Sequence, residues 1–307
     1  MTVHAHAEGH DHGHAHGHSH APADFGRAFA VGIALNLGFV IVEAVFGFVA
    51  NSMSLLADAG HNLSDVLGLV VAWTAGMMAR QPASPRFTYG LKKAPILAAL
   101  ANSIFLVMAV GAIGAEAIRR LMHPSPTEGG TVVAVAAIGI VINGLTAMLF
   151  ARGREHDINV RGAYLHMAAD AAVSGAVVLA GLVIVWTGQR WVDPAMSLAV
   201  AITILWSSTG LLRESVGMSL MGVPSGIELD EVEAELAALD GVEAIHDLHI
   251  WPLSTTETAL TAHIVTQRAD YPDALLESAR AVLHDRFHIE HCTIQVERHH
   301  PAGHENC

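Results

Sequence analysis

The sequence predicts a polytopic α-helical membrane protein with six transmembrane helices, followed by a C-terminal cytoplasmic α+β domain. Of the 307 residues, 52% are hydrophobic and only 15% are charged, whereas soluble proteins carry about 25% charged residues. The mean hydropathy is +0.43, but hydropathy falls and charged residues dominate after about Gly222. This composition excludes an ordinary cytosolic enzyme. The net charge of −13 has the wrong sign for a nucleic-acid partner.

Six apolar stretches reach the length of about 20 residues that a membrane-spanning helix requires. Polar, Gly and Pro residues separate them, as expected for connecting loops. The predicted spans are Arg27–Ala50, Leu55–Ala79, Ala94–Leu121, Thr131–Phe150, Ala163–Thr187 and Pro194–Leu212, the last extending a little beyond Leu212.

Basic residues flank the spans unevenly, and cytoplasmic loops carry the excess of Lys and Arg. Three flanking basic residues (Arg119, Arg120 and Arg190) lie on one side of the predicted membrane. Nine lie on the other: Arg27, Arg80, Arg86, Lys92, Lys93, Arg152, Arg154, Arg161 and Arg213. We therefore expect both termini in the cytoplasm, and we expect a bacterial inner membrane as the location. The first residues show no pattern of a removable signal peptide.

The polar tail has the periodicities of a small α+β domain in the order αββαβ, a ferredoxin-like arrangement with helices on one face of a sheet. Its predicted elements are Glu228–Leu239, Ala244–Leu253, Thr256–Thr266, Pro272–Phe287 and Cys292–Glu297. The whole chain then divides into a disordered His-rich cytoplasmic arm (residues 1–24), the six-helix transmembrane domain (25–221), the cytoplasmic metal-binding domain (222–300) and a flexible tail (301–307).

Two predicted spans carry the same ionisable pattern, His-x3-Asp. His61 and Asp65 lie in the second span, and His166 and Asp170 lie in the fifth. Residues i and i+4 share one face of a helix, so each span presents an imidazole and a carboxylate one turn apart. Two such helices facing each other offer two nitrogens and two oxygens, a tetrahedral set suited to Zn²⁺.

A single His–Asp pair is equally consistent with a hydrogen bond between packed helices. Because ionisable residues inside a membrane are costly and by default functional, two identical pairs favour the metal site. Asp58, on nearly the same helix face, is interpreted as a helix-entry or supporting group rather than a fifth ligand. Glu43 and Asn36 share a face of the first span, where interhelical hydrogen bonding is favoured over a proton-relay role for Glu43.

Histidine is more frequent than Lys and Arg together, with 21 residues against 16. The first 20 residues hold eight histidines separated by small residues, a composition that cannot build a packed core. We expect this arm to bind metal in an accessory way, without a defined site. These histidines are His4, His6, His10, His12, His14, His16, His18 and His20.

The chain resembles the cation diffusion facilitators over nearly its whole length. The resemblance rests on the six spans, the paired His-x3-Asp motifs, the αββαβ tail and three further stretches: Ser54–His61, His246–Trp251 and Thr293–Glu297. The branch that it resembles most contains bacterial zinc exporters and vertebrate vesicular zinc transporters.

This resemblance implies a homodimer that exchanges cytoplasmic Zn²⁺ for protons by alternating access, and not an enzyme. His61, Asp65, His166 and Asp170 would be the transport site. In this family an Asp at the position of His61 accompanies weaker restriction to zinc, so His61 favours zinc, with cadmium or cobalt as secondary substrates.

The resemblance also implies a cytoplasmic binuclear zinc site that uses His246, His263 and Glu297. Regular strand alternation places His263 and Glu297 away from the core but His246 on the opposite face, and by this pattern His249 fits better. We keep His246, because it lies near the start of its strand, where alternation is unreliable.

Three alternatives stay open at this point. A membrane-embedded metal sensor or store would use the His-rich segments without transport, but it leaves the two matched intramembrane pairs unexplained. The same transporter with cadmium or cobalt as its main substrate fits the same ligands. A zinc-dependent intramembrane hydrolase would need an open coordination position and a catalytic acid or base, and neither is predicted.

Overall fold

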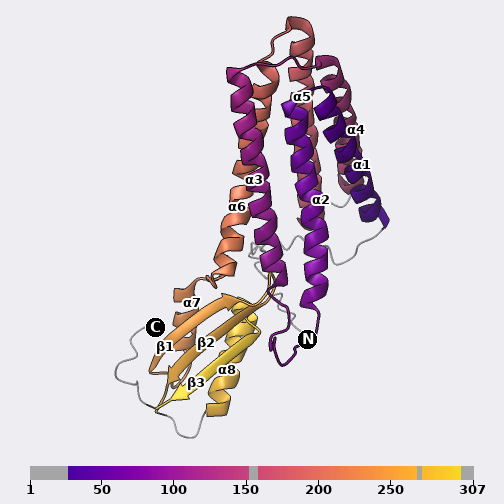
Figure 1. Ribbon diagram of the computed structural model, residues 1–307. Coiled ribbons are helices and arrows are strands. Elements are labelled where there is room, and N and C mark those ends of the chain that lie inside the picture. The colour runs from indigo at the N-terminus through magenta and orange to yellow at the C-terminus, as the bar shows by residue number, and fades with distance from the viewer. Residues whose placement is uncertain (1–26, 152–157, 268–271, 299–307) are drawn as a thin grey trace, which may run out of the picture.

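We describe a computed structural model of the chain, which covers residues 27–151, 158–267 and 272–298. Figure 1 shows a long bundle of helices with a small mixed domain at one end of it. The predicted His-rich arm (1–24) and tail (301–307) lie outside the described residues.

Six long helices form the bundle, as predicted. They are α1 (Arg27–Val49), α2 (Met53–Ala79), α3 (Ala94–Met122), α4 (Gly129–Ala151), α5 (Ile158–Thr187) and α6 (Val192–Ser219). Within the described residues, α2 to α6 are long and apolar enough to cross a membrane, and α1 has a shorter apolar stretch, Ala34–Val49. The chain is therefore a multi-pass membrane protein.

Two helices extend by five or more residues beyond the apolar limits that hydropathy predicted. α5 begins at Ile158, five residues before the predicted start, and α6 continues to Ser219, seven residues past the predicted end. Hydropathy marks only the part of a helix that suits lipid, whereas backbone hydrogen bonding continues into the polar region. The ends of these helices are therefore set by backbone geometry rather than by the bilayer.

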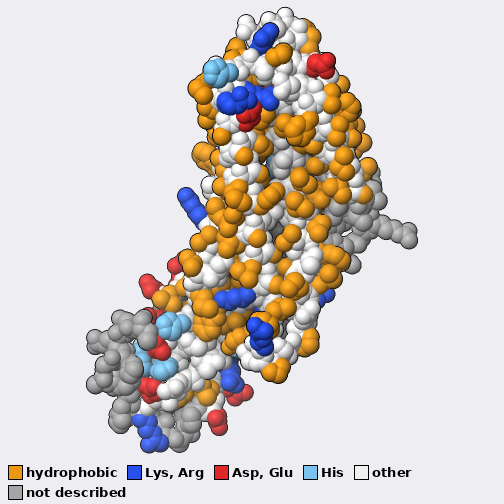
Figure 2. All heavy atoms as spheres, in the orientation of Figure 1, with side chains coloured by type: hydrophobic (Ala, Val, Ile, Leu, Met, Phe, Trp, Pro, Cys, Tyr) orange, Lys and Arg blue, Asp and Glu red, His pale blue; other side chains and the backbone are white. Residues whose placement is uncertain are grey.

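The bundle has a small buried core and an apolar outer surface. α4 packs on α5, α3 on α6, and α2 lies between α1 and α3. The core holds aliphatic side chains such as Leu55, Leu106 and Val177, all less than 8% exposed. Phe48 and Trp206 are more than 75% exposed, and hydrophobic side chains cover the bundle surface in Figure 2. This distribution suits a bundle whose exterior faces lipid.

The start of α2 is held by a carboxylate from another helix. Asp193, in the first turn of α6, is 1% exposed. It accepts hydrogen bonds of 2.6 Å from the Ser52 and Ser54 hydroxyls and from the backbone N–H of Met53, and a longer one from the backbone N–H of Ser54. The first N–H groups of a helix lack partners within it and favour a negative charge. Asp193 thereby joins α2 to α6 at the end of the bundle far from the C-terminal domain.

The C-terminal domain has the predicted αββαβ order, and its sheet is formed by three strands in the order β1-β2-β3. The pair β1–β2 is antiparallel, and β2–β3 is parallel. Both helices cover one face of this sheet (Figure 1) and bury Leu236 and Leu283 against Leu260 and Ile264. The elements are α7 (Leu229–Ala237), β1 (Ala244–Pro252), β2 (Thr258–Val265), α8 (Pro272–Phe287) and β3 (His291–Glu297).

The loop between α2 and α3 contacts this domain. Lys92 forms an ion pair with Glu257, just before β2. The Tyr89 ring meets the His291 ring edge-on, with centroids 5.3 Å apart. The C-terminal domain therefore contacts the end of the bundle that carries the α2–α3 loop, which we call the near end.

Replacing Asp193 with Ala should destabilise the protein by about 3 kcal/mol, because the substitution leaves several buried donors without an acceptor. Thermal unfolding in detergent, with urea titration for the free energy, measures this. The control is Ser197→Ala, one turn further along α6, where the buried hydroxyl has no hydrogen-bond partner among the described residues. A loss below about 1 kcal/mol for Asp193→Ala would contradict the proposed role of this contact.

Candidate metal centres

The two His-x3-Asp motifs face each other across α2 and α5. His61 Nε2 lies 3.7 Å from Asp65 Oδ2 on its own helix and 3.6 Å from Asp170 Oδ1 on the other. His166 Nε2 lies 3.2 Å from Asp65 Oδ2 and 3.6 Å from Asp170 Oδ2. The two imidazole rings are nearly perpendicular, with centroids 6.1 Å apart. The fold thus brings all four predicted side chains to one place.

One ligand atom each of Asp65, His166 and Asp170 lies within 4.8 Å of the others, and His61 lies beside this group, nearest to the other oxygen of Asp170. Zinc bonds to nitrogen and oxygen of about 2.0–2.1 Å give ligand-to-ligand edges of about 3.3 Å in a tetrahedron. The four nitrogen–oxygen distances are 3.2–3.7 Å. Asp65 Oδ2 and Asp170 Oδ2 are buried and have no hydrogen-bond partner. A metal ligand must have a free lone pair, and these oxygens have one. A buried oxygen without a hydrogen-bond partner would otherwise destabilise the protein.

Exposure differs between the two sides of this cluster. His166 and Asp65, toward the C-terminal domain, have side chains that are 44% and 29% exposed. On the far side, Glu43, Asp58 and Ser174 are completely buried. The ligands nearer to the C-terminal domain are therefore the more exposed ones, and the side of the cluster that carries the buried groups is called its closed side.

A layer of polar side chains lies directly beyond the cluster on its closed side. Asp58 accepts a 3.2 Å hydrogen bond from the Ser174 hydroxyl of α5, and Glu43 accepts one of 3.3 Å from the Asn62 amide. Asn36, seven residues before Glu43 in α1, donates a 4.0 Å hydrogen bond to the sulfur of Met167. The sequence pattern did not single out Asn62 or Ser174. Asn62 directly follows the predicted ligand His61, and Ser174 follows the predicted ligand Asp170 by four residues.

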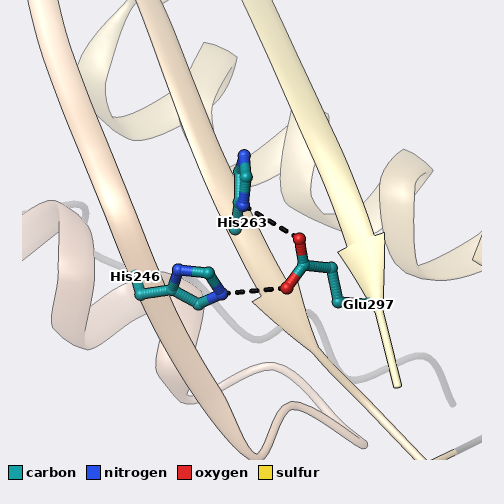
Figure 3. A group of neighbouring side chains, drawn as sticks. All are labelled: His246, His263 and Glu297. Atoms are coloured by element: carbon teal, nitrogen blue, oxygen red, sulfur yellow. Dashed lines mark hydrogen bonds and ion pairs between the residues drawn. The ribbon is translucent and has the colours of Figure 1, made fainter. Parts of the chain in front are cut away.

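A second cluster lies on the open face of the C-terminal sheet (Figure 3). Glu297 of β3 lies between two imidazoles, 3.1 Å from His246 Nε2 and 3.0 Å from His263 Nδ1. Each of the three residues offers one ligand atom, and these three atoms all lie within 4.8 Å of one another. The structure therefore brings together the three residues that the resemblance suggested.

A bulge in β1 explains why strand alternation misplaced His246. His246 is paired with His263, and His249 with Thr261, so two residues of β1 oppose one of β2 between these pairs. The extra residue is Asp247, whose φ is 52°, and a bulge shifts the alternation of side chains by one. His246 and His249 therefore share the open face, and the expectation that they lie on opposite faces was wrong.

Asp247 itself is a polar group that the sequence analysis missed. Its carboxylate lies 3.0 Å from His249 Nε2 and 3.7 Å from His263 Nε2. Partial burial acts to raise the pKa of Glu297, but hydrogen bonds from His246 and Gln295 and the nearby imidazoles outweigh it, so that this pKa is lowered. The open face thus presents an ionised carboxylate between imidazoles, which is a suitable donor set for a divalent cation.

Comparison with known proteins assigns both parts of the chain. Residues 29–218 match the family described as the cation efflux transmembrane domain, and residues 224–299 match the cytoplasmic domain of cation efflux proteins. The chain is 35% identical to the metal cation efflux system protein CzcD of Cupriavidus metallidurans, over 90% of this chain and 88% of that protein.

Two further relatives carry more specific names. The zinc transporter ZitB of Escherichia coli is 36% identical over 88% of this chain and 87% of its own length. A cadmium, cobalt and zinc/H(+)-K(+) antiporter of Bacillus subtilis is 34% identical over 88% of both chains.

Proposed function

This chain belongs to the cation efflux family, whose members are transporters rather than enzymes, and on that premise we propose that it exports Zn²⁺ from the cytoplasm in exchange for protons. The family assignment establishes efflux of divalent cations. The proposal adds the ion, the residues that bind it and the exchange with protons.

The observation that carries the proposal is the convergence of His61, Asp65, His166 and Asp170 at separations of 3.2–3.7 Å inside the bundle. Two carboxylates would balance the charge of one dication, so the loaded site would be electrically neutral. The mixture of two imidazoles and two carboxylates suits zinc better than magnesium or calcium, which prefer oxygen ligands alone. Related proteins named as zinc transporters support the same ion.

Exchange with protons follows from the chemistry of these ligands. A neutral imidazole binds a metal ion, whereas an imidazolium does not, so protons and zinc compete for His61 and His166. Protons that enter from the outer side would displace the metal there, and metal arriving from the cytoplasm would displace protons inward. The name of the Bacillus subtilis relative, which includes proton antiport, supports this exchange.

The asymmetry of exposure around the site is consistent with loading from the cytoplasm. The more exposed ligands, Asp65 and His166, lie toward the C-terminal domain, which matches a cytoplasmic domain family. The loop basic residues near this domain, such as Arg86 and Lys92, support the same orientation. The structure would then represent the state that accepts Zn²⁺ from the cytoplasm.

We further propose that the cytoplasmic cluster of His246, His263 and Glu297 binds Zn²⁺ and that the chain acts as a homodimer. The donor set supports the first proposal, because the carboxylate lies within 3.1 Å of two imidazole nitrogens. The matched family of the cytoplasmic domain, whose name denotes a dimer, supports the second.

Replacing Asp170 with Asn, or His61 with Ala, should lower zinc flux at least about 100-fold, because each change removes one of four ligands. Flux is measured in proteoliposomes with a zinc-responsive dye inside and a pH dye in parallel. Ser64→Ala, a buried neighbour of Asp65 whose hydroxyl has no partner among the described residues, is the control and should transport normally. Wild-type flux in either ligand variant would refute the site assignment, and zinc binding without any flux in the unmodified protein would indicate a sensor or store.

Replacing His61 with Asp should make the transporter less selective for zinc. A third carboxylate adds a hard oxygen ligand, which favours manganese. We expect the preference for zinc over manganese to fall at least about tenfold. Competition assays with zinc, cadmium, cobalt and manganese measure this preference. His61→Asn removes the imidazole without adding a charge, so it should lose zinc flux and gain none with manganese. An unchanged preference in His61→Asp would show that His61 does not set selectivity.

His263→Ala should reduce the zinc tightly bound per chain by about one ion, since a site of three ligands cannot lose one and keep its affinity. Equilibrium dialysis of the detergent-solubilised protein, followed by metal analysis, gives the stoichiometry. The exposed residue His284, which contacts Asp285 away from the cluster, supplies the control His284→Ala. Equal zinc content in the wild type and His263→Ala would rule out this cytoplasmic site.

A further inference from the structure

Two carboxyl groups that are not among the proposed zinc ligands lie together inside the bundle. Glu43 of α1 and Asp58 of α2 are both 0% exposed, and the two carboxyl groups lie close enough for each to influence the charge of the other. Asp58 precedes His61 by three residues, and its partner Ser174 follows Asp170 by four. The pair therefore lies about one helix turn beyond the zinc ligands, on the closed side of the site.

The hydrogen bonds of this pair are incomplete. Each carboxyl has one oxygen that accepts from a neutral donor: Glu43 Oε2 from Asn62 and Asp58 Oδ2 from Ser174. The other oxygens, Glu43 Oε1 and Asp58 Oδ1, are buried and have no hydrogen-bond partner. Two ionised carboxylates cannot donate to each other, so they would repel with two acceptors unsatisfied. One proton on the pair supplies the missing donor and removes one of the two charges.

Among the described residues, no Lys or Arg side chain acts on this pair to balance two negative charges. α1 packs against α2 and α4, and the sequence of α4 contains no ionisable residue. The ionisable groups that act on the pair from α2 and α5 are His61 and Asp170. A proton on the pair, a proton on His61 or a nearby dication is therefore the available source of positive charge. Buried carboxyl pairs of this kind typically share one proton and titrate as a unit.

Resting on the proposed exchange of zinc for protons, we propose that Glu43 and Asp58 form a proton-binding site, separate from the zinc ligands, that carries one proton in each transport cycle. When Zn²⁺ binds from the cytoplasm and displaces fewer than two protons from the imidazoles, the net positive charge one turn away rises and favours the ionised pair, and the proton of the pair leaves to the cytoplasm. When the bundle opens outward, a proton from that side returns to the pair as Zn²⁺ departs. One proton thus moves inward on this pair for each zinc ion that moves outward.

The test is the ratio of protons to zinc in proteoliposomes that contain the full chain, measured with pH-sensitive and zinc-sensitive dyes. Glu43→Gln keeps the size of the side chain and supplies a permanent donor to Asp58, but it cannot release a proton. We expect this variant to bind zinc with wild-type stoichiometry and to move about one proton fewer per zinc ion. Glu43→Asp, which retains a carboxyl group, should restore the missing proton.

A second measurement reads the proton directly. The zinc-induced infrared difference spectrum of the wild-type protein should show loss of a protonated carboxylic acid band, and this loss should be absent in Glu43→Gln. Ser174→Ala is the matched control, because it removes a hydrogen bond to Asp58 without removing a titratable group. It should keep both the proton ratio and the infrared band.

Three results would overturn the proposal. An unchanged proton ratio and an unchanged infrared band in Glu43→Gln would show that the pair carries no proton, while leaving zinc–proton exchange intact. Fewer zinc ions bound by Glu43→Gln would show that the pair holds metal instead. Zinc flux without proton flux in the wild type would refute the exchange itself, and with it this role for the pair.

Discussion

The central constraint on this structure is that two carboxylates and two imidazoles lie together in the middle of an apolar bundle, where their charges must be balanced. Removing an ion from water costs several kcal/mol even after the protein relaxes, unless other charges compensate. Asp65 and Asp170 are brought together with His61 and His166, so a divalent cation or protons on the imidazoles can balance them. The metal-bound site and the site with protonated imidazoles exclude each other, because a protonated imidazole cannot bind a metal ion. Competition between metal and protons is therefore inherent in this choice of side chains, before any movement of the helices.

The surrounding helices hold this arrangement asymmetrically. At the far end, Asp193 binds the start of α2 and joins it to α6, and Glu43, Asp58 and Ser174 fill the space beyond the ligands. At the near end, the ligands are partly exposed toward the C-terminal domain. The buried polar groups thus lie on one side of the ligands and the more exposed ligands on the other, an asymmetry that the proposed alternating access would use in one of its two end states.

The sequence predicted those features that depend on short spacing along one element. The i, i+4 spacing of His61 and Asp65 is enough to place both side chains on one helix face, and hydropathy is enough to locate the helices. The contact between α2 and α5 could not be derived from spacing, because it depends on packing in three dimensions. Asn62 and Ser174 were missed for the same reason, since their role is defined by partners on other segments.

The cytoplasmic sheet shows a different limit. Alternation along β1 assigned His246 to the wrong face because the rule assumes a regular strand, whereas Asp247 adds one residue to it. The sequence carries no clear signal for a bulge at this Asp. The resemblance to a known family identified His246 correctly as a neighbour of His263, although the physical reason is the bulge rather than irregularity at the start of the strand.

The most direct test of the central claim is a zinc-bound structure of the full chain with anomalous diffraction at the zinc edge. We expect an anomalous peak between α2 and α5, about 2.0–2.2 Å from one nitrogen of His61, one of His166 and one oxygen each of Asp65 and Asp170. Zinc bound elsewhere in the transmembrane bundle, with no peak between these two helices, would contradict the account.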